Sequence, residues 1–587
     1  FLFGSPINIG SPPDDFGFPP IEIFLPIDFG PPPSDFGPFP TNPDDDARDG
    51  EDFVAPPPEA ATPASGSDDH FLLGNFLQLG VSSAGVLGTA QIPPAGTITS
   101  PSNSGISVLL DLDGFAAGSA STPPRSGDFF LPNNPQEGYV LGFKLDSGLR
   151  TDNFVQDSTG RNDIGAATTD FSSGSVQGTR TEILFSSESV QFEQIISFNQ
   201  DDSFFKTEVT ITNNGARTLE DFRYMRTADS NVDFDTSSAN PNTKNSVLSN
   251  PTSGDNLTAI SQAIGPDSGF GINLISIDGN ARASNFGTNN ADVFDNRAFS
   301  TPVNQAGAQV DEAITLTLSF GDIDPGETVT RSFFTSFQVD PTFVSTANDM
   351  IVGTANADTI STGDGDDTIF DLEGADTISA GNGNDTIIAG VGNDTFDGGS
   401  GVDTLDYRNS AAISADFAAG TVTVSGTAEV DKFTSIEVIN GSRSSDTMLG
   451  STGNETMTGS HGADTLSGAG GADTFQYLEP EDGDVRTVNG TVGSNGGDLI
   501  TDFTTGNDSI GISILGFGLT SISSSNFEVL SVRYDGTNST LADFAAGSPV
   551  LIYEEPNALL IYDDNGSSDG YTVLLNNSVG ISNPAGN

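Results

Sequence analysis

Acidic residues recur at a fixed interval within residues 353–476. Six nonamers follow one another without a gap, from "GTANADTIS" at 353–361 to "GGSGVDTLD" at 398–406. In each nonamer an aspartate is followed by Thr and then by Ile, Phe or Leu, and these aspartates are Asp358, Asp367, Asp376, Asp385, Asp394 and Asp403. Carboxylates combined with the carbonyls of glycine-rich turns are the oxygen ligands that Ca²⁺ accepts in irregular geometry.

The same frame resumes after a 34-residue insertion at 407–440. Its acidic positions are Asp446, Glu455, Asp464 and Asp473, each again followed by Thr and an apolar residue. A solvated acidic linker is the simplest alternative, but it has no reason to keep Thr and an apolar residue in phase at ten positions. We therefore expect an ordered repeat, in which a turn that needs positive φ leads into a short strand with one inward apolar side chain.

The nonamers match the glycine-rich, aspartate-containing pattern of calcium-binding β-helices. This part of the chain resembles the RTX, or hemolysin-type calcium-binding repeat, family. The resemblance implies a parallel β-roll in which stacked turns hold several Ca²⁺ ions between aspartate side chains and the carbonyls near glycines. The implied metal positions are Asp358, Gly363, Gly365, Asp367, Asp376, Gly381, Gly383, Asp385, Gly390, Gly392, Asp394, Gly399, Gly401, Asp403, Asp446, Glu455, Asp464 and Asp473.

Two nonamers complete one coil of such a roll, so residues 18 apart should stack. Asp358, Asp376 and Asp394 would then line one edge. Asp367, Asp385 and Asp403 would line the other. Like charges stacked at strand spacing, about 4.8 Å, repel strongly unless a cation lies between them. The roll should therefore need calcium to fold, because its sites form only in the ordered chain.

The end of the repeats also resembles a known group of proteins. "GGADTFQY" at 470–477 followed by "DLITDFTTGNDSI" at 498–510 is similar to the end of the calcium roll in secreted proteases of the serralysin type. The resemblance implies type I export, read from an uncleaved carboxy-terminal region, and an extracellular location, secreted or at the cell surface. The protease's His-Glu-x-x-His helix is missing, since His70 and His461 are the two histidines of the sequence.

The composition limits the partners. The chain has 19 Lys and Arg against 81 Asp and Glu, a formal net charge of −62, so its field repels nucleic acid and attracts cations. It has no cysteine, which excludes disulfides and thiolate metal sites. We find no apolar run long enough for a transmembrane helix. The abundance of Gly, Asn, Ser and Thr favours turns and strands, so we expect an all-β protein.

Four segments follow from these patterns: an extended Pro-rich arm and linker at 1–69, an antiparallel β-sandwich domain at 70–345, the β-roll at 346–478, and a β-rich carboxy-terminal cap and secretion region at 479–587. Within the second segment, alternating apolar residues from Phe205 to Ile211, the turn "NNGA" and then Phe222 with Tyr224 predict a β-hairpin. The alternation leaves open whether this segment is one sandwich or two smaller ones.

The stretch "EDFRYMRTADSNVDFD" at 220–235 mixes arginines with aspartates. It could form the site of a secreted polysaccharide-active enzyme, since a glycosidase needs only two carboxylates. More often such a strand segment is a cross-strand ion-pair ladder. A third alternative is an adhesin whose second segment binds a cell-surface polysaccharide.

Apolar residues alternate from Ile21 to Phe29, although residues 1–69 hold 16 of the 33 prolines. Proline blocks self-pairing but allows pairing at the edge of a waiting sheet. We expect arm residues 1–43 to dock on the same chain or on a neighbouring subunit, where a contact that does not close would propagate a polymer. The leading hypothesis is a secreted calcium-binding structural protein that self-assembles into an extracellular filament, sheath or surface layer.

Overall fold

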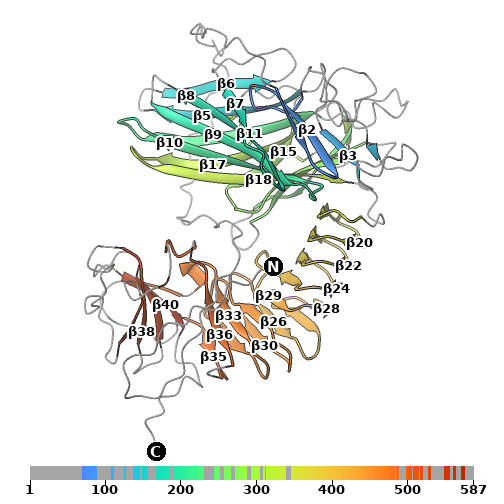
Figure 1. Cartoon of the computed structure of the whole chain (residues 1–587), viewed down its shortest axis with the longest axis vertical. Helices are drawn as coiled ribbons and strands as arrows, with labels where there is room; N and C mark the ends of the chain where they lie inside the picture. Colours follow the sequence, from blue (N-terminus) through green and yellow to red (C-terminus); the bar gives the residue numbers. More distant parts are fainter. Residues whose placement is uncertain are drawn as a thin grey trace, which may run out of the picture.

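The computed structural model is all-β, as the composition predicts (Figure 1). It describes residues 69–88, 108–111, 125–126, 136–145, 148–156, 167–185, 189–229, 243–251, 257–265, 271–286, 292–304, 308–310, 313–338, 345–482, 484–487, 497–504, 507–514, 516–519, 522, 527–530, 548–554, 559–563 and 570–575. The predictions for the arm, residues 1–43, lie outside these ranges. Within them one short 3-10 helix, η4 (Pro480–Asp482), is the helical element, and no helix is long and apolar enough to cross a membrane.

Residues 167–338 supply an antiparallel nine-stranded sheet, which faces a five-stranded antiparallel sheet. In spatial order, the nine strands are β16 (Ala308–Val310), β12 (Thr243–Ser249), β13 (Ala259–Ile264), β14 (Gly271–Ser276), β18 (Thr328–Gln338), β10 (Phe205–Asn213), β9 (Val190–Asn199), β8 (Val176–Phe185) and β7 (Ala167–Asp170). The five strands are β15 (Ala281–Asn285), β17 (Ile314–Ile323), β11 (Leu219–Asp229), β5 (Gln136–Leu145) and β6 (Gly148–Gln156).

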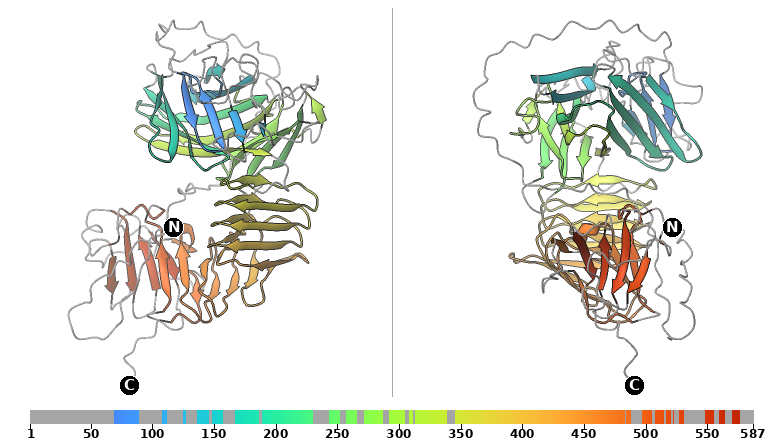
Figure 2. Two further views of the ribbon diagram at one scale, coloured as in Figure 1. Left: turned by 45° about the vertical axis from the view of Figure 1, so that its right-hand side comes forward. Right: turned by 90° about the vertical axis from the view of Figure 1, so that its left-hand side faces the viewer.

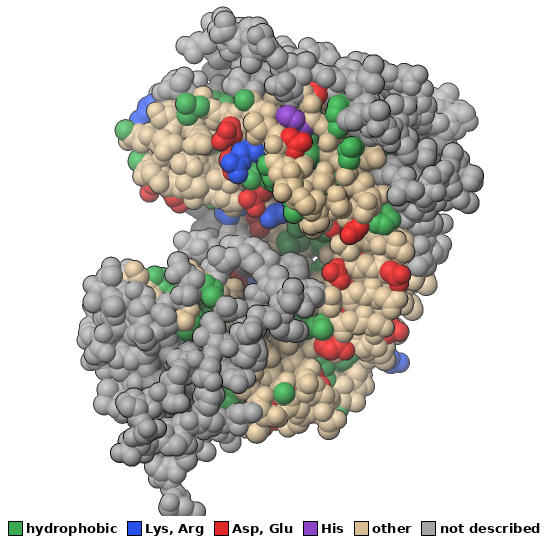
Figure 3. All heavy atoms as spheres, in the orientation of Figure 1, with side chains coloured by type: hydrophobic (Ala, Val, Ile, Leu, Met, Phe, Trp, Pro, Cys, Tyr) green, Lys and Arg blue, Asp and Glu red, His purple; other side chains and the backbone are tan. Residues whose placement is uncertain are grey.

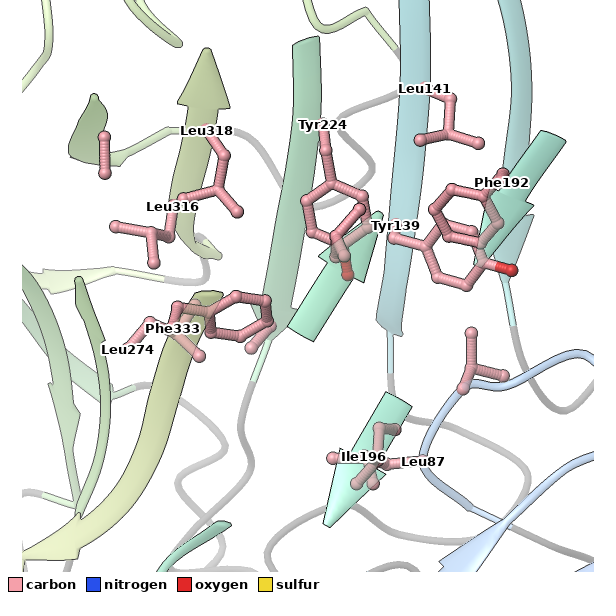
Figure 4. Close-up of a cluster of buried hydrophobic side chains, with 14 of the residues drawn as sticks. Leu87, Tyr139, Leu141, Phe192, Ile196, Tyr224, Leu274, Leu316, Leu318 and Phe333 are labelled. Atoms are coloured by element: carbon pink, nitrogen blue, oxygen red, sulfur yellow. The ribbon is translucent and has the colours of Figure 1, made fainter. Parts of the chain in front are cut away.

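A single hydrophobic core joins the two sheets, so the domain is one sandwich rather than two. Tyr139 of β5 stacks on Phe192 of the opposite sheet, with ring centroids 5.6 Å apart, and on Tyr224 of β11 at 5.7 Å. Figure 4 shows these rings together with Phe333 and Leu316 between the sheets. A small sheet adds further core residues; its strands are β1 (His70–Leu73), β2 (Leu77–Val81), β3 (Val108–Asp111) and β4 (Arg125–Ser126).

The hairpin predicted around "NNGA" is wrong. β10 pairs with β9 and β18 in the large sheet, whereas β11 pairs with β5 and β17 in the other sheet. The alternation correctly gave each strand one buried face, but it carries no information about the pairing partner. The turn instead crosses between sheets, and the buried Asn213 holds it by donating from Nδ2 to the carbonyls of Arg217 and Ile323, at 2.8 Å each.

The repeats form two parallel sheets that stack coil upon coil (Figure 2). One has the order β19 (Met350–Val352), β21 (Thr368–Phe370), β23 (Thr386–Ile388), β25 (Thr404–Asp406), β29 (Val438–Asn440), β31 (Thr456–Thr458), β33 (Thr474–Tyr477) and β36 (Ser509–Ile512). The other begins with β20 (Thr359–Asp364), β22 (Thr377–Asn382) and β24 (Thr395–Ser400). Ile360, Ile378 and Phe396 are register partners in succession, so the coil is 18 residues long, and all three are buried.

The segment 407–440 stays within the roll. Its first two strands form an antiparallel pair inside the second sheet, which continues as β28 (Val430–Thr434), β27 (Thr421–Val424), β26 (Ile413–Asp416), β30 (Thr447–Leu449), β32 (Thr465–Ser467) and β35 (Leu499–Ile500). β28 and β29 carry on the parallel stacking, 37 and 34 residues after β24 and β25. Since β35 and β36 add a further coil, the parallel sheets extend beyond residue 478, to Ile512.

The two ends of the roll are covered by other parts of the chain. At one end, Met350, Val352 and Phe370 pack against Ile260 and Ile275 of the sandwich. At the other end, the roll shares its core with a five-stranded sheet in the order β34 (Asp484–Thr487), β40 (Gly570–Leu575), β39 (Leu559–Asp563), β38 (Val550–Glu554) and β37 (Phe527–Leu530). The roll therefore exposes neither of its end coils, as repeat arrays require.

Candidate metal centre

Each repeat aspartate lies at the end of a turn, directly before a short strand. From Asp367 to Asp403, the carboxylate of each one accepts a hydrogen bond from the backbone of the preceding coil. The Oδ1 of Asp376 accepts a hydrogen bond from the backbone N–H of Asp358, at 2.6 Å. The Oδ1 of Asp394 accepts from Asp376 in the same way, at 2.8 Å. On the other edge, the N–H groups of Asp367 and Asp385 donate to the next carboxylates at 2.8 and 2.9 Å. The stacked aspartates thus form two ladders, one along each edge of the roll, and each acidic residue is one rung of its ladder.

The glycines of the turns allow the coils to approach closely. Gly363, Gly365, Gly381, Gly383, Gly399 and Gly401 all have positive φ, between 102° and 145°. A Cβ at Gly383 would lie 1.8 Å from the carbonyl oxygen of Gly365. Gly390 and Gly392 lie on the opposite edge, where their Cβ atoms would fall 1.7 and 2.1 Å from carbonyl oxygens of the preceding coil. No side chain fits at these positions without moving backbone oxygens.

The second run of repeats forms the same arrangement. The N–H of Asp446 donates to Asp464 at 2.7 Å, and the N–H of Glu455 donates to Asp473 at 3.0 Å. Glu455 occupies an aspartate position, and its carboxylate is held by the Ser451 hydroxyl. All four acidic residues are buried.

Five acidic residues that sequence reasoning missed extend the ladders. The backbone N–H of Asp349 donates a hydrogen bond to the carboxylate of Asp367, and the backbone N–H of Asp403 donates one to the carboxylate of Glu437. The backbone N–H of Asp394 donates to the carboxylate of Asp431. The last rungs are Asp498 and Asp508, whose carboxylates accept from the N–H groups of Asp464 and Asp473. Each of these acids is followed, two residues later, by a buried apolar residue such as Phe433 or Ile439. That acid-x-apolar pattern was the signal; it was overlooked because Met, Lys, Val, Leu or Ser replaces the usual Thr.

The second carboxylate oxygen of many rungs is buried without a hydrogen-bond partner. These oxygens are the Oδ2 atoms of Asp367, Asp376, Asp385, Asp394, Asp403, Asp464 and Asp498. Leaving a buried carboxylate oxygen unpaired is costly, so a ladder of them requires a counter-charge or protons. The observation tests the calcium assignment directly, because hard anionic oxygens aimed into a dry turn are the donor set that Ca²⁺ takes.

Burial disfavours ionisation along both ladders. Desolvation, with the neighbouring carboxylates adding to it, raises the pKa of Asp367 to about 8 and that of Asp385 to about 7. Desolvation and the charge of Asp498 raise the pKa of Asp464 to about 11. A divalent cation between the rungs reverses this effect, since it favours the ionised carboxylates.

A second acidic group in the roll suits an ion pair better than a metal. His461, Glu479 and Asp482 place ligand atoms within 4.8 Å of one another. His461, however, uses both ring nitrogens, Nδ1 toward Arg443 at 3.1 Å and Nε2 toward Glu479 at 2.9 Å. No lone pair of the ring is left for a cation.

Asp221, Arg223 and Arg226 of the stretch at 220–235 form ion pairs. Arg226 is buried against Glu137 of the adjacent strand. Asp221 bonds Arg223 at 2.8 Å and pairs with Lys144 of that strand at 2.9 Å. The pairs of Arg226 with Glu137 and of Asp221 with Lys144 are cross-strand ion pairs, the commoner alternative for such a segment.

Comparison with known families decides the nature of the repeats. Residues 344–370, 372–405 and 440–475 match the model of the RTX calcium-binding nonapeptide repeat, in four copies. The chain carries RTX calcium-binding repeats. The matched RTX segments coincide with the coils whose carboxylates form the ladders, and they lie outside the sandwich.

A search of curated proteins finds no match. Among solved structures, similarity extends to a TPR-domain containing protein from Parabacteroides distasonis (11% identity, TM-score 0.25, 45% of this chain and 46% of that one). It also extends to a galactose mutarotase-like protein from Lactobacillus casei (8% identity, TM-score 0.25, 46% and 100%). The chain spans less than half of the first of these. At such TM-scores neither likeness supports a functional argument.

Proposed function

We propose that the protein is a secreted calcium-binding structural protein whose β-roll folds when it binds Ca²⁺ outside the cell. The supporting observation is the set of stacked, buried carboxylates, several of which, such as Asp385 and Asp394, have one oxygen bonded to the preceding coil and the other unpartnered. Repulsion between them opposes folding where calcium is scarce, and the bound ions remove it where calcium is abundant. Calcium thereby ties folding of the roll to the extracellular space.

The second part of the proposal is self-assembly. Residues 1–43 dock on a neighbouring subunit and build a filament, sheath or surface layer, with the alternating residues from Ile21 to Phe29 as the added strand. Support comes from the sequence, which gives these residues an apolar face and prolines that prevent self-pairing. The roll would act as the calcium-stiffened spacer between sandwich and cap.

Electron microscopy tests the assembly. The full chain should form polymers with millimolar calcium and disassemble when a chelator is added. A chain lacking residues 1–43 should bind the same amount of calcium and remain monomeric. Monomers under all conditions would refute self-assembly while leaving calcium binding intact, and assembly of the truncated chain would exclude the arm as the connector.

A further inference from the structure

One coil of the roll carries a carboxylate that its neighbours lack. Asp371 opens the turn at 371–376, whereas Gly353 and Ala389 occupy the same place one coil before and one coil after. It is the first residue of its nonamer, a position that is Gly, Thr or Ala in the other five consecutive nonamers, so the repeat pattern does not account for an acidic residue there. Its side chain is nevertheless 1% exposed.

Asp371 lies against two rungs of one ladder. Asp371, Asp376 and Asp394 each offer a carboxylate oxygen, and these oxygens lie within 4.8 Å of one another. Two ligands of a single Ca²⁺, each about 2.4 Å from the ion, can be at most about 5 Å apart. The spacing of the three oxygens is therefore compatible with one ion between them.

Each of the three carboxylates has an oxygen to spare. Oδ1 of Asp376 and Oδ1 of Asp394 accept the ladder hydrogen bonds, and Oδ2 of Asp371 lies 3.3 Å from the N–H of Gly390. The remaining oxygens, Oδ1 of Asp371 and Oδ2 of the other two, are buried and have no hydrogen-bond partner. Three such carboxylate oxygens in one dry turn require either protons or a cation between them, and a cation is the partner that suits their ionised forms.

We propose that Asp371, Asp376 and Asp394 form a three-carboxylate calcium site, the tightest of the roll and the first to fill. The proposal rests on the proposed function, in which the roll binds calcium, and adds a ligand outside the repeat motif. Affinity for Ca²⁺ rises with the number of charged ligands, so a third carboxylate distinguishes this site from those with two. Filling it joins the coils at 371–388 and 389–406 before the others order.

A calcium titration of the full chain by isothermal calorimetry tests the proposal, with D371N and E373Q compared with the unsubstituted protein. Glu373 lies in the same turn and is exposed, so E373Q removes the same charge without touching the site. We expect D371N to weaken the tightest site by at least about tenfold and to leave the other sites unchanged. E373Q should bind as the unsubstituted chain does.

The melting temperature of the metal-free chain distinguishes the loss of a calcium ligand from general damage to the fold. Removing one of three crowded carboxylates lowers their repulsion, so metal-free D371N should melt at a higher temperature than the unsubstituted chain, even though it binds calcium less well. Unchanged affinity in D371N would overturn the proposal while the roll's calcium binding stood. Weakening of every site, together with a lower metal-free melting temperature, would also overturn it. Absence of binding in all three proteins would refute the proposed function itself.

Discussion

A single repeat aspartate links two coils through one oxygen and leaves the other for a cation. Asp385 illustrates this, since its Oδ1 bonds the N–H of Asp367 and its Oδ2 is buried without a partner. The aspartates with Thr after them could be placed from the sequence, because the interval of nine fixes their stacking. Asp349 and Asp431 carry only the acid-x-apolar part of that pattern, and their ladder role depends also on three-dimensional register across the junction and the hairpin.

The raised pKa values predict an unusual pH dependence for the metal-free roll. The pKa of Asp367 is raised to about 8, above its value of about 4 in the unfolded chain. Between those values the folded state binds more protons, so the free energy of unfolding falls as pH rises. Melting followed by circular dichroism, after calcium removal, should give a higher melting temperature at about pH 5 than at about pH 8. A metal-free melting temperature that increased over this window would contradict the assignment of buried, unpaired carboxylates.

Close stacking of the turns predicts the effect of a single methyl group. Gly383 has φ 142°, and its Cβ would collide with the carbonyl of Gly365. Gly383→Ala should destabilise the folded roll by more than about 3 kcal/mol, since strain adds to the clash. Gly470→Ala is the matched control, because Gly470 lies in a repeat turn with nothing near its Cβ. Equal calcium-dependent melting curves for the two variants would show that the turns are looser than described.

At the scale of elements, the roll was more predictable than the sandwich. Residues 18 apart pair as expected because the repeat specifies both the strands and their register. In the sandwich the pattern gave strands with one buried face, but the partners of β10 and β11 depend on long-range packing in the shared core. The corner between them is fixed by the amide of Asn213, which no sequence period reveals.

Asn213→Ala should therefore weaken the sandwich selectively. The substitution removes the amide hydrogen bonds to the carbonyls of Arg217 and Ile323, the second of them buried, at a cost of about 2 kcal/mol. Hydrogen exchange in β10 and β11 should quicken, while calcium binding by the roll stays unchanged. Asn214→Ala, at the exposed neighbour, should have no effect. Unaltered exchange in Asn213→Ala would show that the corner does not depend on this side chain.

The whole molecule consists of a sandwich with a hydrophobic core and a roll whose acidic ladders we propose to need calcium. Their junction is direct: Ser203 of the sandwich donates to Asp349, the first rung of one ladder, at 2.5 Å. Figure 3 shows acidic side chains along the visible face of the roll, in keeping with the net charge of −62. In the proposed function, calcium is the counter-ion that lets so acidic a chain become compact in this region.

Hydrogen exchange of the full chain, with calcium and after its removal, tests the central claim most directly. If calcium holds the roll together, residues 345–512 should lose protection when calcium is removed, and strands β9, β10 and β11 of the sandwich should keep theirs. Restoring calcium should restore the protection of the roll. Equal protection of residues 345–512 in both forms would contradict calcium-dependent folding.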